Sequence, residues 1–207
     1  MPDDERQQLF EAQTRKQFEA LGRFVQAFEH MVFAVRSSIE SRLQQESPDM
    51  VYFTRMIFHH RALTAWPLWE IFRGMVYTDV SELRLVSPPD IDIFRSVLTK
   101  IGHEVEALVS ARNNVLHGTP FIGWTSSQQT DFEQMDIFKW GVSAKGWSEL
   151  KTPKSAADLT KLVARCQGAG SAVRLIAAAA AKQSDASRSH LISQSLEAVT
   201  SEVEPLN

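Results

Sequence analysis

One short segment of the chain combines an arginine, two asparagines and a histidine. It reads Arg112-Asn113-Asn114-Val115-Leu116-His117 and is followed by Gly118. A guanidinium cannot lose its proton and is costly to bury alone, so Arg112 requires a carboxylate, backbone carbonyls or an anionic ligand such as phosphate. Asn113 and His117 are four residues apart and share one side of a helix that extends so far. The segment predicts that a guanidinium, an amide and an imidazole meet at one helix end.

The helix that carries this segment has clear start and stop signals. Ser87-Pro88-Pro89 precedes it, with Asp90 as the expected N-cap, and Gly118 and Pro120 end it. Its apolar face consists of Ile91, Phe94, Leu98, Ile101, Val105, Leu108 and Val109. On the helical wheel Arg112 falls in the middle of this face, which is why it stands out.

Two further helices are predicted before this one. The first runs from about Asp3 to Gln45, and its apolar stripe is Phe18, Leu21, Val25, Phe28, Val32, Val35 and Ile39. The second runs from about Met50 to Tyr77, with a kink at Pro67. It is apolar around most of its circumference and therefore central. Its one polar stripe contains Arg55, His59, Glu70 and Arg73, and forms either a cleft wall or, more often for such stripes, a solvated face.

The helical period disappears between Phe121 and about Leu150. Residues 121–125 and 135–140 read as two short strands that form a hairpin. Thr152-Pro153 then starts a fourth helix, with Thr as cap and Pro at the first position. After Lys182 the chain is polar and forms at best a loosely attached amphipathic helix. We therefore expect a helical domain over residues 1–182, an insertion at about 121–150 and a polar tail over 183–207.

Length and composition favour one mainly helical domain. The chain has 207 residues, enough for one domain with a sizeable core, and its 9 glycines and 8 prolines suit long helices with few turns. The formal charge of −3 gives no overall basic signature. Any contact with nucleic acid must then depend on a local cluster. The expected fold class is all-α.

The single cysteine and the sequence of the first residues indicate the cellular compartment in which the protein is expected. Cys166 is the only cysteine, which excludes an intramolecular disulfide and a cysteine-based zinc site. The first ten residues are acidic and polar and lack the apolar region of a secretory signal. No stretch of about 18 apolar residues occurs. We expect a cytoplasmic protein with no membrane partner.

The segment from Arg112 to His117 resembles the R-x4-6-H motif of the HEPN superfamily. The likeness is to the R-N-x-x-x-H form, which is often followed by glycine, as here by Gly118. The expected surroundings agree, because a long first helix and a buried second helix precede the helix that ends in the motif. The resemblance implies an up-and-down bundle of four to five helices, with a small β-hairpin or irregular insertion after the third.

This resemblance also implies an activity. HEPN proteins of this kind are metal-independent endoribonucleases in which two motif copies meet across a homodimer, often in toxin–antitoxin or defence systems. Carried over, Arg112 and His117 are the catalytic residues, with His117 transferring protons and Arg112 stabilising charge on the phosphate. Asn113 and Asn114 bind substrate. The implied partners are RNA, a second copy of the chain and an antitoxin or regulatory protein, with no metal and no cofactor.

Other interpretations of the same residues remain open. The superfamily includes inactive members, so this chain could instead be a helical module that binds a partner protein or a nucleotide. Arg112 could form a buried pair with a carboxylate such as Glu70. His117 could cap the helix through its last carbonyls. Arg55 and His60 have the same spacing as the motif, but we expect His60 to be a core histidine.

Overall fold

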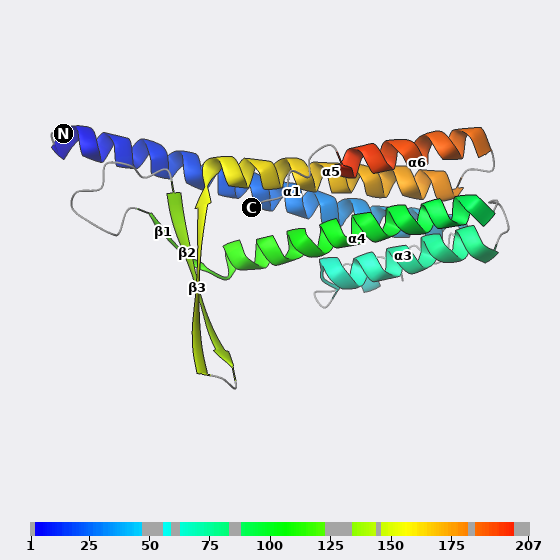
Figure 1. Cartoon of the computed structure of the whole chain (residues 1–207), viewed down its shortest axis with the longest axis horizontal. Helices are drawn as coiled ribbons and strands as arrows, with labels where there is room; N and C mark the ends of the chain where they lie inside the picture. Colours follow the sequence, from blue (N-terminus) through cyan, green and yellow to red (C-terminus); the bar gives the residue numbers. More distant parts are fainter. Residues whose placement is uncertain are drawn as a thin grey trace. The chain divides into compact units, whose positions relative to one another are not determined.

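The computed structural model describes residues 3–46, 56–58, 63–82, 88–122, 134–143, 146–181 and 185–200. Helices form most of this part of the chain (Figure 1), so the predicted mainly helical class is confirmed. The chain divides into two compact units. Unit 1 contains Met1–Ala27 and Ser110–Val163, and unit 2 contains Phe28–Val109 and Ala164–Asn207. The predicted domain bounds of 1–182 and 183–207 stay a prediction.

The first helix, α1 (Asp3–Glu46), has almost the bounds that its periodicity predicts. Its first turn holds three acidic residues, which interact favourably with the positive end of the helix dipole. The predicted buried stripe is partly wrong, since Phe18 is 52% exposed whereas Phe24 and Met31 are buried. Three buried alanines, Ala20, Ala27 and Ala34, continue the same face. The prediction followed the large apolar side chains and overlooked these small ones.

The second predicted helix is interrupted, since residues 56–58 are helical and residues 63–64 are not. The helix α3 covers Ala65–Glu82, and the backbone N–H of Leu68 donates to the carbonyl of Thr64 at 3.2 Å. Thr64 therefore precedes the first turn, and Pro67 lies within that turn. A proline is tolerated there because the first backbone N–H groups of a helix have no partner within it. The predicted kink at Pro67 is wrong: the proline marks a helix start.

Within unit 2, α3 packs against α4 (Pro88–Leu116) through a tryptophan and a glycine. The two helices lie side by side (Figure 1). Trp69 is fully buried, and a Cβ atom added to Gly102 of α4 would lie 3.0 Å from its Nε1 atom. A second helical glycine, Gly74 of α3, has nothing within 4 Å of such a Cβ atom. One glycine therefore makes room for the indole, and the other faces open space.

Substitution of these two glycines by alanine should have opposite effects on the free energy of unfolding. Alanine gains about 1 kcal/mol of helix propensity over glycine in a helix interior. We expect Gly74→Ala to raise the free energy of unfolding by up to about 1 kcal/mol. Gly102→Ala should instead lower it by about 1–3 kcal/mol, because Trp69 has no space to withdraw. Urea denaturation followed by circular dichroism measures both, and equal effects of the two variants would contradict this packing.

The helix α4 confirms most of its predicted core face. Phe94, Leu98, Ile101, Val105 and Leu108 are all buried. The helix begins at Pro88, so Asp90 lies inside its first turn and is not the N-cap that we expected. Proline suits the first turn of a helix because its φ angle is already helical. The helix ends at Leu116, directly before His117.

Three strands follow α4 and form an antiparallel sheet in unit 1. The order is β1 (Thr119–Ile122), β2 (Gln134–Ser143) and β3 (Gly146–Ser155), with β2 in the middle. The sequence predicted strands near the first two and none at the third. On β2, Met135 and Ile137 are buried, as expected for alternate residues on one face of a strand. Each edge strand contains a proline, Pro120 in β1 and Pro153 in β3.

The helix α5 (Ala156–Ala181) begins three residues after the predicted start, because Thr152 and Pro153 belong to β3. Its N-cap is Ser155. The Ser155 backbone N–H donates to Asp158 Oδ2 at 2.9 Å, and the Asp158 backbone N–H donates to Ser155 Oγ at 3.1 Å. These reciprocal bonds form a capping box with aspartate in the usual place of glutamate. Asp158 also places a negative charge at the positive end of the helix.

The polar segment after Lys182 contains the helix α6 (Asp185–Thr200), which lies along α5 in unit 2 (Figure 1). Ile192, Ser195 and Val199 are buried at spacings of three and four residues. The Ser195 hydroxyl donates to the carbonyl of Leu191 at 2.9 Å and approaches that of Ala172 in α5 at 3.5 Å. This face is packed, where the sequence predicted loose attachment. No helix in the described ranges is long and apolar enough to cross a membrane.

Candidate functional site

The arginine and the first asparagine of the motif are in direct contact. Arg112 Nη1 donates a hydrogen bond to Asn113 Oδ1 at 3.3 Å, and both side chains are half-buried. The two residues lie in the last turns of α4, within unit 1. A guanidinium has five N–H donors in a fixed fork, so it can bond an amide and further acceptors at the same time.

The histidine is held at the end of the same helix. The backbone N–H of His117 donates to the carbonyl of Asn113 at 3.1 Å, which closes the last helical turn. The His117 side chain is exposed, and Gly118 follows it. The imidazole is therefore fixed at its backbone and open to solvent at its ring. A positive charge on this ring would interact favourably with the last carbonyls of α4.

A buried valine anchors this helix end. Val115 lies between the asparagines and His117 and is only 4% exposed. The other described core residues of unit 1 include Phe24, Met135, Ile137, Leu159 and Leu162. Because Val115 is buried while Arg112, Asn113 and Asn114 are only half-buried, the polar side chains lie at the border between core and solvent. This border is where groups that meet a ligand are expected.

The other polar residues that the sequence singled out lie elsewhere. Glu70 and Arg73 form an exposed ion pair on α3, with Arg73 Nη2 at 2.8 Å from Glu70 Oε2. Glu70 thus pairs with a neighbour on its own helix, as expected for a solvated face, and the alternative pair with Arg112 stays a prediction. Arg55, His59 and His60 fall outside the described residues.

The sequence analysis missed a buried ion pair in unit 2. Arg165 of α5 donates to both carboxylate oxygens of Glu104 in α4, at 2.6 and 3.0 Å. Their side chains are 13% and 9% exposed. Glu104 lies beside Ile101, Val105 and Leu108 on the helical wheel. A charged residue within this apolar stripe is the feature of the sequence that indicates a buried ion pair. The same signal marks Arg112 further along the helix.

Cys166 lies next to this ion pair in sequence and is fully buried. Burial raises the pKa of its thiol to about 12, and the Glu104 carboxylate also raises it. The reactive form of a cysteine is the thiolate. Cys166 is therefore a packing residue and carries no chemistry in the folded protein. Across the described part of the chain, no group of three His, Cys, Asp or Glu side chains could hold a metal ion.

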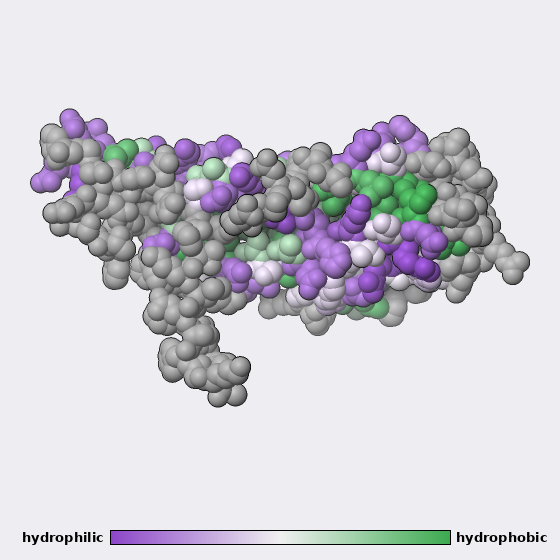
Figure 2. All heavy atoms as spheres, in the orientation of Figure 1, coloured by the Kyte–Doolittle hydropathy of each residue, from purple (hydrophilic) through white to green (hydrophobic). Residues whose placement is uncertain are grey.

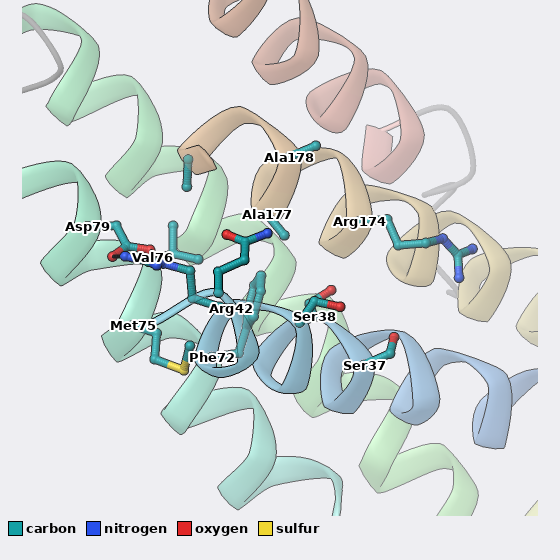
Figure 3. Close-up of a pocket in the computed structure, with 13 residues that line it drawn as sticks. Ser37, Ser38, Arg42, Phe72, Met75, Val76, Asp79, Arg174, Ala177 and Ala178 are labelled. Carbon is teal, nitrogen blue, oxygen red and sulfur yellow. Dashed lines mark hydrogen bonds and ion pairs between the residues drawn. The ribbon is translucent and has the colours of Figure 1, made fainter. Parts of the chain in front are cut away.

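A cavity of about 330 Å³ lies in unit 2 among α1, α3 and α5 (Figure 3). On one side Arg42 and Asp79 point toward one another and form two hydrogen bonds of 2.8 Å each. Phe72, Val76 and Ala177 supply apolar lining. The cavity contains none of the site residues predicted from the sequence. Its ion pair joins α1 to α3 and neutralises both charges.

Comparison with models of protein families, with curated proteins and with solved structures finds no match to this chain. The function is therefore inferred from the residues of the chain itself. Among the described residues, the end of α4 combines an accessible imidazole with a guanidinium in contact with an amide. This combination can bind an anion and transfer a proton, which makes the end of α4 the candidate site.

Proposed function

We propose that this protein is a metal-independent endoribonuclease of the HEPN type that acts as a homodimer. The observation that carries the proposal is the hydrogen bond between Arg112 and Asn113, one turn before the exposed His117. The order of elements agrees with the HEPN-like bundle, since a long α1 and the shorter α3 precede the helix that ends in the motif. The sheet and the long α5 follow it.

In the proposed reaction the ribose 2′-oxygen attacks the adjacent phosphorus atom, and the bond from phosphorus to the 5′-oxygen breaks. The products are a 2′,3′-cyclic phosphate and a 5′-hydroxyl group. His117 transfers the proton that leaves the 2′-hydroxyl or the proton that the 5′-oxygen gains. Arg112 binds the phosphate oxygens and stabilises the charge that develops on them. Asn113 orients Arg112 through its bond, and Asn114 is the second substrate-binding amide.

The homodimer is part of the proposal because the reaction needs two proton transfers. One proton leaves the 2′-hydroxyl and another reaches the 5′-oxygen, whereas each motif copy contains one histidine. Two copies of the α4 end facing each other supply both groups, and they also double the positive charge at the phosphate. An antitoxin or another regulatory protein that covers this end would keep the enzyme inactive in a toxin or defence system.

A non-enzymatic helical module is the second candidate function. The observation that favours it is the position of His117, whose ring is exposed beside the last carbonyls of α4, as in a simple helix cap. In this case Arg112 and Asn113 stabilise the helix end, and the surface binds a partner protein or a nucleotide without cleaving it.

The test is incubation of the purified protein with a mixed RNA pool in EDTA, beside the His117→Ala variant. We expect the wild type to cleave RNA and to leave cyclic-phosphate and 5′-hydroxyl ends, and the variant to leave the RNA intact. Chelation excludes contaminating metal-dependent nucleases. Intact RNA in both tubes across several substrates would favour the module, and equal cleavage in both would remove His117 from the mechanism.

A further inference from the structure

Within the described part of unit 2, a shallow recess has a lining with positive charge and no carboxylate. It lies between α3 and α4 and has a volume of about 300 Å³. Its lining residues are Arg73, Gly74, Tyr77, Arg95, Leu98 and Thr99. In Figure 2, hydrophilic side chains gather over these two helices. Two guanidiniums at one recess favour an anion as its occupant.

Arg95 is held in place by Tyr77 and by an ion pair with Asp92. Its Nη2 atom donates to the Tyr77 hydroxyl at 2.8 Å, and its guanidinium carbon lies 5.5 Å from the centre of the Tyr77 ring. The hydrogen bond to Tyr77 is also the main reason why the pKa of Arg95 is raised. The contact from Nη1 to Asp92 is longer, 3.3 Å, and Asp92 does not line the recess. A guanidinium held in this way loses little conformational freedom when it binds.

Arg73 reaches the recess from the neighbouring helix. Its Nη2 atom is bonded to Glu70, which does not line the recess. In the part of the chain that the structure describes, this bond is the one that Arg73 makes, so Nε and Nη1 keep their donor capacity. The Arg73 side chain is 51% exposed. Glu70 therefore orients the guanidinium from outside without occupying the anion position.

A glycine without near neighbours lines the recess. Gly74 lies in the interior of α3, and nothing approaches within 4 Å of where its Cβ atom would be. Glycine weakens a helix interior, so its presence there is not explained by helix stability. The absence of a side chain at this position leaves room in the recess that Gly74 and the two arginines line. Beneath it, Leu98 is buried and gives the recess an apolar base.

We propose that this recess binds the phosphate group of a nucleotide unit, either in an RNA strand or in a free nucleotide. Arginine forks match the geometry of phosphate oxygens and form charge-assisted hydrogen bonds with them. Tyr77 is 43% exposed and its ring contacts the Arg95 guanidinium, so a base beside the bound phosphate would meet an aromatic side chain. A pair of arginines with an adjacent aromatic ring recognises a nucleotide better than an isolated anion. The recess lies in unit 2 and shares no residue with the motif at the end of α4, and the proposal does not rest on the cleavage reaction.

The test uses three probes: inorganic phosphate, adenosine 5′-monophosphate and a single-stranded RNA with 2′-O-methyl groups. The methyl groups block attack by the 2′-oxygen, so binding is measured whether or not the protein is a ribonuclease. We expect binding of the RNA by fluorescence anisotropy at low salt. Arg73→Ala and Arg95→Ala should each weaken it about tenfold, as expected when a charged hydrogen bond is removed. In a plot of the logarithm of the binding constant against the logarithm of the salt concentration, the slope should become less steep by about 0.7 for each phosphate group that no longer contacts an arginine.

Two further variants distinguish binding in the recess from attraction of the RNA by the overall charge of the protein. Arg23→Ala removes an exposed arginine that is paired one turn away with Glu19, and it should leave binding unchanged. Gly74→Leu keeps every charge and fills the recess, so it should weaken RNA binding at least as much as the arginine variants do, while circular dichroism shows an intact helical fold. The proposal is overturned by an equal loss of binding in Arg23→Ala, by normal binding in Gly74→Leu, or by no binding of any probe. Binding of the RNA alone identifies a strand site, and binding of the mononucleotide as well identifies a nucleotide site.

Discussion

Replacing Arg112 by alanine should lower the rate of RNA cleavage by about two to three orders of magnitude, the usual loss when one group that stabilises transition-state charge is removed. Arg112 is the residue of the motif that combines a fixed positive charge with a defined partner, since it donates to Asn113 at 3.3 Å. The expected loss is in the rate of the chemical step. Single-turnover cleavage of a labelled RNA at saturating protein measures this rate directly.

Arg112→Lys is the matched variant for this prediction. Lysine keeps the charge but has no planar fork, so it cannot bond two phosphate oxygens side by side. We expect an intermediate rate, between those of the wild type and Arg112→Ala. All three proteins should show the same helical circular dichroism, because Arg112 is only half-buried and Val115 continues to anchor the helix end. Wild-type rates in both variants would exclude Arg112 from the active site.

Removing one partner of the ion pair between Glu104 and Arg165 should lower the free energy of unfolding more than the glycine substitutions do. We expect Glu104→Leu to lower the free energy of unfolding by about 3 kcal/mol, because Arg165 would stay buried at 13% exposure without a carboxylate. Leucine keeps most of the volume, so the effect is electrostatic rather than a cavity. Urea denaturation followed by circular dichroism is the measurement.

A double variant and a surface control complete this test. Glu104→Leu combined with Arg165→Met replaces the pair by apolar side chains and should restore most of the stability of the wild type. Glu19→Ala breaks an ion pair whose side chains are 58% and 69% exposed, and it should cost less than about 1 kcal/mol. If Glu104→Leu were as mild as Glu19→Ala, the pair would contribute little to the packing of unit 2.

The long helices could be predicted because their periodicity extends over many turns. The bounds of α1 and the C-terminal end of α4 follow from apolar spacing and from the glycine and proline after Leu116. Helix starts were less predictable, because proline and threonine fit several structures equally well. Thr152-Pro153 has the composition of a helix start and yet lies in β3, where Pro153 pairs with Asp136. The capping contacts of Ser155 decide the start of α5, and they depend on the folded chain.

The candidate site could be predicted in part from the sequence. The residue types and spacing from Arg112 to His117 mark it, and the structure adds the contact between Arg112 and Asn113. The ion pair of Glu104 could be suspected but not assigned, because its partner is 61 residues away along the chain. The recess of α3 and α4 could be predicted only as one possible cleft wall that contains Arg73. It exists because two helices place Arg73 and Arg95 at one opening.

The two prolines in the sheet restrict how copies of this chain can associate. An edge strand exposes unpaired N–H and C=O groups and is a template for strand addition and for aggregation. Both edge strands of the described sheet contain a proline, Pro120 in β1 and Pro153 in β3, and proline lacks the N–H group that an added strand would need. Each proline therefore weakens the pairing that an added strand could make at its edge of the sheet. We expect a homodimer of this protein to associate mainly through side chains, on helix surfaces or sheet faces.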